Sequence, residues 1–221
     1  MAVTIDYVIS YIVTIGATLI LSMYFFREYY LKRLRASLAW AAGLLLYGIV
    51  QIGHLAVAMV GEVAMGKPAM GGALVILALA LTLIYYGTSQ LFFSPGSFFR
   101  EKMSAFVLLI CFVLFAVLLA TFPTEGFAAR IPPYVEPLAT LVFLFTGVSF
   151  YNVFRRLGPG DPRRRTVLLV SLGWFLVVID TIYLGFAQGL SRTLDTVINI
   201  EHAVAWLLLL YGMALGKAAR T

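Results

Sequence analysis

The segment that decides the fold is residues 193–217, which read TLDTVINIEHAVAWLLLLYGMALGK. It is long and apolar enough to cross a bilayer. Its first half nevertheless carries four polar or ionisable side chains, Asp195, Asn199, Glu201 and His202. A charged group at the centre of a spanning helix costs roughly 2.5–3.5 kcal/mol on insertion scales, so such groups face a protein interior or a wet cavity. All but Glu201 share one helical face with Trp206.

The composition of the whole chain also indicates a membrane protein. The chain has 221 residues, of which 62% are hydrophobic and 12% are charged. A soluble domain is about half apolar and about a quarter charged. The sequence therefore predicts an all-α, polytopic membrane protein in which no residues are left for a soluble domain.

Apolar segments separated by Gly, Pro and charged residues predict seven helices in a single transmembrane domain covering residues 1–221. They are expected at about residues 4–26, 37–60, 71–93, 103–122, 134–154, 166–187 and 193–216. The first residues lack the basic region of a secretory signal, so the first helix is expected to be retained. The single cysteine, Cys111, excludes a disulfide within the chain.

The distribution of cations predicts the orientation. Thirteen Lys and Arg residues fall in loops 1–2, 3–4 and 5–6 and in the C-terminal tail, against three in the opposite loops (Lys67, Arg130 and Arg192). Because cations concentrate on the cytoplasmic side, the N-terminus is predicted outside and the C-terminus inside, in the cell membrane. The same distribution explains the net charge of +6 without nucleic acid as a partner.

Polar side chains recur at one depth in several helices. His54, Asp180 and His202 each lie roughly 21–24 Å from the predicted inner edge, at 1.5 Å per helical residue. Polar stripes on the same helices, and on the first helix at Tyr7 and Tyr11, point to a cavity or network that opens outward. The predicted polar contacts are Gln51, His54, Asp180, Tyr183, Asn199 and His202, with Trp40, Trp174 and Trp206 as apolar walls.

Four interpretations of these side chains remain open at this point. The first is interhelical hydrogen bonding alone, which stabilises membrane bundles by about 0.6 kcal/mol per bond on average. The second is a pocket for a small or lipidic ligand. The third is a cofactor: His54 and His202 could supply both axial ligands of a b-type haem in an electron carrier, or bind zinc with Asp180, using Glu201 or Glu62 as a base. The fourth is a small transporter, for which no helix broken by proline is evident.

Two resemblances bear on these alternatives. The seven-helix layout with an outer N-terminus resembles the microbial rhodopsins, whose retinal-binding lysine lies midway along the last helix. The matching residues here are 203–209, AVAWLLL, and Lys217 is at the membrane edge, so retinal is not expected. Residues 35–48, RASLAWAAGLLLYG, look like the second helix of the seven-helix sensor regions of some prokaryotic histidine kinases. That resemblance covers one helix of the seven.

The expected function is that of a non-enzymatic, sensor-like or ligand-binding membrane protein with an outward-facing polar pocket. The few residues that follow Lys217 are too short to form an output domain. A signal would therefore have to pass to a separate signalling or membrane subunit.

Overall fold

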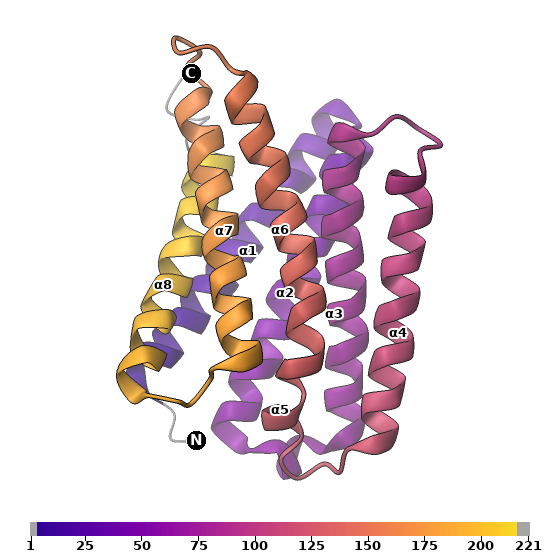
Figure 1. Cartoon of the computed structure of the whole chain (residues 1–221), viewed down its shortest axis with the longest axis vertical. Helices are drawn as coiled ribbons and strands as arrows, with labels where there is room; N and C mark the ends of the chain where they lie inside the picture. The colour runs from indigo at the N-terminus through magenta and orange to yellow at the C-terminus, as the bar shows by residue number, and fades with distance from the viewer. Residues whose placement is uncertain (1–3, 216–221) are drawn as a thin grey trace.

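The computed structural model describes residues 4–215, and all of its regular elements are helical (Figure 1). They are α1 (Ile5–Lys32), α2 (Arg35–Val60), α3 (Glu62–Phe92), η1 (Phe98–Lys102), α4 (Met103–Thr121), α5 (Phe127–Arg130), α6 (Pro132–Arg156), α7 (Arg164–Phe186), α8 (Arg192–Leu210) and η2 (Tyr211–Leu215). Within these residues, seven helices are long and apolar enough to cross a membrane, which favours a multi-pass membrane protein.

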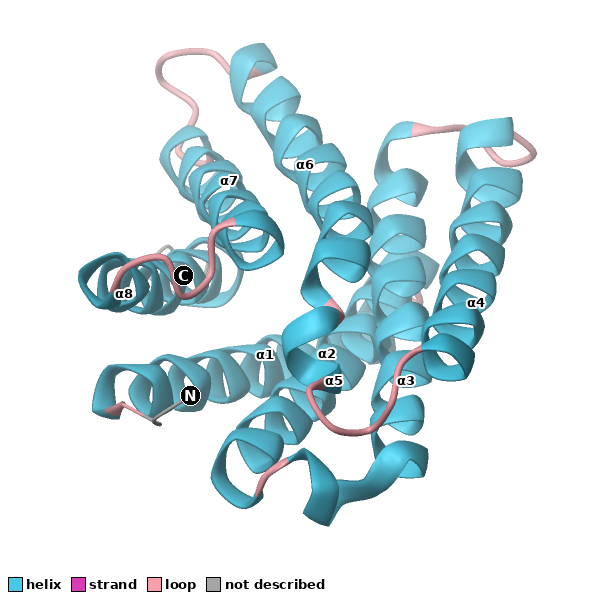
Figure 2. Cartoon of the chain, turned by 60° about the horizontal axis from the view of Figure 1, so that its bottom comes forward, coloured by secondary structure: helices cyan, strands magenta, loops and turns pink. Residues whose placement is uncertain are grey.

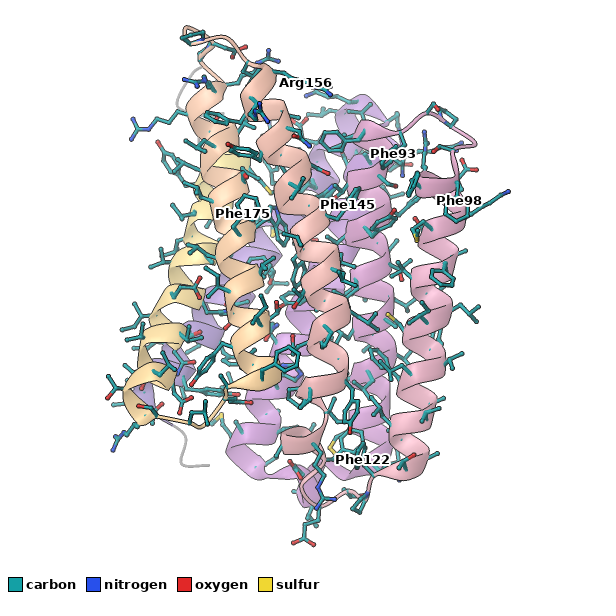
Figure 3. The ribbon with its side chains drawn as sticks, in the orientation of Figure 1. Phe93, Phe98, Phe122, Phe145, Arg156 and Phe175 are labelled. Carbon is teal, nitrogen blue, oxygen red and sulfur yellow. The ribbon has the colours of Figure 1, made fainter. Side chains whose placement is uncertain are left out.

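The long helices run up and down between two ends of the bundle. The lower end in Figure 1 holds the start of α1, the α2–α3 and α7–α8 connections, and the short helix α5. The upper end holds the α1–α2, α3–α4 and α6–α7 connections, and Arg156 is labelled there in Figure 3. The terms lower end and upper end are used below in this sense.

Several helices extend beyond their predicted bounds because polar residues continue them. α1 was expected to end near residue 26, but it runs to Lys32, where an ion pair of 2.6 Å joins Lys32 Nζ to Glu28 one turn earlier. Arg33 then ends the helix in the left-handed region, with φ of 54°. The last helix was expected at 193–216. Its α-helical part ends at Leu210, a π-helical turn follows to residue 215, and Gly216 and Lys217 lie outside the described residues.

Residues 61–70, expected to connect the second and third helices, are largely helical. Gly61 closes the α2–α3 connection with φ of 87°, and α3 begins at the next residue. Gly66 interrupts α3 with φ of 75° and ψ of 156°, and Pro68 starts the uninterrupted part. Proline is tolerated in a first turn because its missing N–H has no helical partner there. The predicted start at residue 71 was therefore too late, and the break lies at the end of the helix.

Consecutive long helices pack against one another from α1 to α4 and from α6 to α8. α3 also packs against α6, and α8 closes the arrangement against α1 (Figure 2). α4 is the most apolar candidate span and the least buried, and it packs chiefly against α3. The other long helices surround a core rich in aromatic rings. Phe145 of α6 stacks on Phe93 just beyond α3, with ring centroids 6.2 Å apart (Figure 3).

Close packing of η2 against α7 depends on Gly212. A Cβ atom built on Gly212 would lie 2.6 Å from Val170 Cγ2 and 3.0 Å from the carbonyl oxygen of Thr166. The second contact is with backbone, which a rotamer change cannot relieve. The helices meet at this distance only because the residue has no side chain.

We expect Gly212→Ala to lower the stability of the purified protein by about 1–3 kcal/mol, the usual cost of overpacking. Gly16→Ala is the matched control, because a Cβ atom built on Gly16 in α1 would meet nothing within 4 Å. Thermal unfolding in detergent should show a lower Tm for the first variant and an equal or higher Tm for the second. Equal losses would mean that the short contact at Gly212 is unimportant.

Candidate functional site

One pocket at the lower end gathers polar side chains from five helices. Its cavity volume is about 60 Å³. The six polar residues predicted from the sequence all line it: Gln51, His54, Asp180, Tyr183, Asn199 and His202. They come from α2, α7 and α8. The other lining residues are Tyr7, Ser10, Tyr11, Tyr47, Val50, Leu77, Glu136, Ala139, Thr181, Leu184, Gln188, Asp195 and Ile198. We refer to this cavity as the polar pocket.

At the buried centre of the polar pocket, a hydrogen bond joins two helices. Nδ1 of His202 on α8 lies 2.8 Å from Oδ2 of Asp180 on α7, and both side chains are buried. Opposite an ionised Asp180, which can only accept, the His202 ring would donate from Nδ1. This bond fixes the orientation of the imidazole and leaves Nε2 as the ring's second polar atom.

The rim of the polar pocket is held by hydrogen bonds to Asp195 and Asp6. The Tyr183 hydroxyl donates to Asp195 Oδ1, and the Gly189 N–H donates to the same oxygen at 3.0 Å. These bonds connect α7, the following turn and the first turn of α8. Asn199 Nδ2 donates to Asp6 Oδ2 at 2.9 Å, which joins α8 to the start of α1.

His54 differs from His202 in its surroundings. It lines the polar pocket, but its side chain is exposed, and within residues 4–215 it makes no hydrogen bond. Its ring meets Tyr11 edge-on at 6.3 Å between centroids, and Tyr11 also stacks on His202 at 6.4 Å. The two histidines are therefore brought to the same tyrosine ring, as their common depth predicted, but only His202 has a buried polar partner.

Two further groups in the pocket wall lack partners. Ser10 is 1% exposed, and its Oγ has no hydrogen-bond partner. Glu136 begins the second turn of α6, its side chain lies against Gly185, and it makes no hydrogen bond to another described residue. A buried polar group without a partner costs about 1–3 kcal/mol, which applies to Ser10, whereas Glu136 is only partly buried.

Acidic groups dominate the electrostatics of the pocket. Glu136, Asp180 and Asp195 line it, whereas no Lys or Arg is among its lining residues. Glu201 lies just outside, close enough to Asp180 and His202 for their charges to interact, and both of its carboxyl oxygens are buried without a hydrogen-bond partner. Because Glu201 directly precedes His202 in α8, it lies on a different face of the helix.

The three tryptophans expected as apolar walls do not line the polar pocket. Trp206 and Trp174 are fully buried, and their ring centroids are 6.0 Å apart. Trp206 stacks on Tyr47 at 5.3 Å, and Trp174 lies 5.6 Å from Trp40. We call these four rings the aromatic layer. It closes the pocket toward the upper end, and Trp40 lines a different cavity on its far side.

The cofactor alternatives fit this geometry poorly. A haem macrocycle needs a wide slot between its axial ligands, but the cavity is about 60 Å³ and the Tyr11 ring lies against both imidazoles. In the part of the chain that the structure describes, no group of three His, Cys, Asp or Glu side chains could hold a metal ion. Glu62, considered as a base for zinc, instead accepts the N–H groups of Phe127 and Ala128 at the start of α5.

The six polar contacts predicted from the sequence lie on α2, α7 and α8, and the Tyr7 and Tyr11 stripe of α1 was expected to face the same cavity. Ser10, Tyr7 and Tyr11 of α1 and Glu136 of α6 also line the pocket. The tyrosine stripe on α1 was visible as a helical repeat. Ser10 could not be assigned to the pocket from the sequence, because a lone serine in an apolar helix is compatible with any neighbour.

Comparison of the chain with protein-family models, with curated proteins and with solved structures gave no match in any of the three.

We expect the His202–Asp180 bond to contribute to stability as a coupled pair. His202→Ala and Asp180→Ala should each destabilise the fold by about 2–5 kcal/mol, because each leaves a buried polar partner. The double variant should lose less than the sum, with a coupling energy of about 1 kcal/mol or more. Unfolding in detergent of all four proteins measures this coupling.

His54→Ala is the matched control for this double-mutant cycle. Its exposed ring has no hydrogen-bond partner in the described chain, so the loss in stability should be below that of His202→Ala. The role given to the buried bond would be contradicted if the stability losses of His202→Ala and Asp180→Ala were additive in the double variant. It would also be contradicted if His54→Ala lowered stability as much as His202→Ala.

Proposed function

We propose that this chain is a non-enzymatic protein of the cell membrane that binds a small cationic ligand in the polar pocket, which faces outward. The observation that carries this proposal is the composition of the wall: three carboxyl groups and no Lys or Arg line a partly buried cavity. Such a wall favours positive charge and disfavours anions. Ionisable groups within spanning helices mark ligand or ion sites more often than packing alone.

The aromatic lining narrows the ligand class. Tyr7, Tyr11 and Tyr47 line the pocket beside the acidic groups. Tyrosine faces attract ammonium groups, by about 0.5–1 kcal/mol at exposed sites and more where water is excluded. Carboxylates with tyrosine rings suit an amine or ammonium group better than a bare metal ion, which needs several oxygen ligands at fixed geometry.

The volume of the pocket narrows the ligand class further. Pockets for drug-sized molecules measure about 300–1,000 Å³. The polar pocket, at about 60 Å³, has room for a small amine or for the head of a larger molecule. This favours a small polar ligand over the lipidic one that the sequence left open. A sensor-like protein of this kind would pass its signal to a separate subunit, and no observation favours haem or transport over binding.

Binding can be tested with methylammonium and tetramethylammonium as probes. The purified protein in detergent should gain thermal stability with increasing methylammonium chloride, because a ligand that binds only the folded state stabilises it. Sodium chloride at equal ionic strength should not reproduce this gain. In Glu136→Gln we expect affinity to fall about tenfold, or about 1.4 kcal/mol, through loss of the one lining carboxylate without a hydrogen bond.

Glu125→Gln is the matched control, since it removes the same charge from an exposed position outside the pocket. It should bind methylammonium as the parent protein does. Equal weakening in both variants would indicate general charge attraction. No stabilisation by either amine would overturn the proposed ligand class.

The outward orientation is tested by cysteine labelling in intact cells. Glu125→Cys lies at the lower end with the pocket, and Gly160→Cys lies in the α6–α7 connection at the upper end. Both are exposed, whereas the native Cys111 is buried. A membrane-impermeant maleimide should label the first before lysis and the second only after it. The reverse pattern would place the polar pocket on the cytoplasmic side.

A further inference from the structure

A second cavity lies on the other side of the aromatic layer. Its volume is about 270 Å³. Its lining comes from α1, α2, α3, α6, α7 and η2: Tyr24, Phe25, Glu28, Ala36, Ser37, Trp40, Leu91, Phe150, Val167, Val170, Gly212 and Met213. These residues belong to the parts of their helices nearest the upper end. We refer to it as the upper cavity.

The wall of the upper cavity is chiefly apolar. Four aromatic rings contribute to it, and three of them form one contact chain: Phe25 lies 5.7 Å from Trp40, and Trp40 lies 6.3 Å from Phe150. The one charged lining residue, Glu28, forms an ion pair with Lys32 at 2.6 Å. An apolar chain can therefore enter the cavity without burying an uncompensated charge.

The surroundings of the upper cavity are strongly basic. Eleven cationic residues belong to the upper end among residues 4–215, namely Arg27, Lys32, Arg33, Arg35, Arg100, Lys102, Arg155, Arg156, Arg163, Arg164 and Arg165. Three acidic residues accompany them: Glu28, Glu101 and Asp161. Such an excess attracts anions to this end of the molecule.

Two of these arginines are close to the cavity along the chain. Arg35 immediately precedes Ala36, a lining residue. Arg164 lies three residues before Val167, on the same side of α7. The Arg164 guanidinium lies over the Phe154 ring at 4.6 Å, and its Nε is buried without a hydrogen-bond partner. An anionic group at this edge would supply an acceptor for that nitrogen.

We propose that the upper cavity binds a single-chain anionic amphiphile, a long-chain carboxylate of the fatty-acid class. Its tail enters the apolar cavity against Trp40, and its carboxylate stays at the basic edge near Arg35 and Arg164. A volume of about 270 Å³ is too small for two acyl chains, which favours a fatty acid over a phospholipid. This site is independent of the ligand proposed for the polar pocket, and it lies on the opposite side of the aromatic layer.

Trp40 makes the proposal measurable, because bromine atoms on an acyl chain quench tryptophan fluorescence at short range. Dibromostearate should quench the purified protein in a saturable way, and Trp40→Phe should lose the saturable part. The uncharged methyl ester should bind about tenfold more weakly, since it lacks the carboxylate. Quenching by the ester equal to that by the acid would overturn the proposal.

Cavity and charge variants separate the site from general partition into the micelle. Ala36→Leu fills the cavity and should abolish saturable quenching, whereas Ala56→Leu, on α2 outside both cavities, should retain it. Arg35→Gln combined with Arg164→Gln should weaken binding about fivefold or more. Lys102→Gln, at the same end but not within three residues of a lining residue along the chain, should not weaken it.

A second measurement does not depend on fluorescence. A fatty acid carrying a photoreactive diazirine should crosslink to peptides that contain cavity residues, and unlabelled stearate should compete. Crosslinks confined to exposed faces such as α4 would contradict the site. Competition by a two-chain phospholipid as effective as that by stearate would overturn the assignment to a single-chain ligand.

Discussion

The hydrogen bond between His202 and Asp180 shows the constraint on which the rest of the arrangement depends, which is that ionisable groups inside the bundle need polar partners. In a bundle of apolar helices, an isolated ionisable group is costly, because it needs a polar partner that lipid and apolar side chains do not supply. His202 and Asp180 meet this need across α7 and α8 at 2.8 Å. Asn199 and Asp6 do the same across α8 and α1. Gathering such groups at one level creates a polar interior, and a cavity remains where their geometry prevents close packing.

The aromatic layer divides the interior into two environments. Below it, carboxyl groups and tyrosines line a small cavity without cations. Above it, a larger apolar cavity lies near eleven basic residues within the described chain. The contacting rings of Tyr47, Trp206, Trp174 and Trp40 connect the two, with successive centroids 5.3–6.0 Å apart. The unequal charge of the two ends therefore accompanies a difference in the ligand chemistry that each cavity can accommodate.

Part of the polar pocket could be predicted from helical spacing and depth. The level shared by His54, Asp180 and His202 follows from counting residues, because a helix rises by a constant 1.5 Å per residue. The same counting could not place Trp40, Trp174 and Trp206, which were expected as pocket walls and instead form the layer above the pocket. Depth along an axis is a property of one helix, whereas the direction of a side chain relative to a cavity depends on how neighbouring helices are rotated and spaced.

The sequence by itself determined the helical class, the seven apolar segments and the strong asymmetry of charge between their two ends, because these depend on residue type and local periodicity. It did not determine that Glu62 caps α5, that Gly66 interrupts α3 near its start, or that His54 is exposed while His202 is buried. Only the tertiary structure decided these points. The cap by Glu62 and the unequal burial of the two histidines depend on which atoms of distant segments come within a few ångströms of one another, and such contacts leave no periodic trace in the chain.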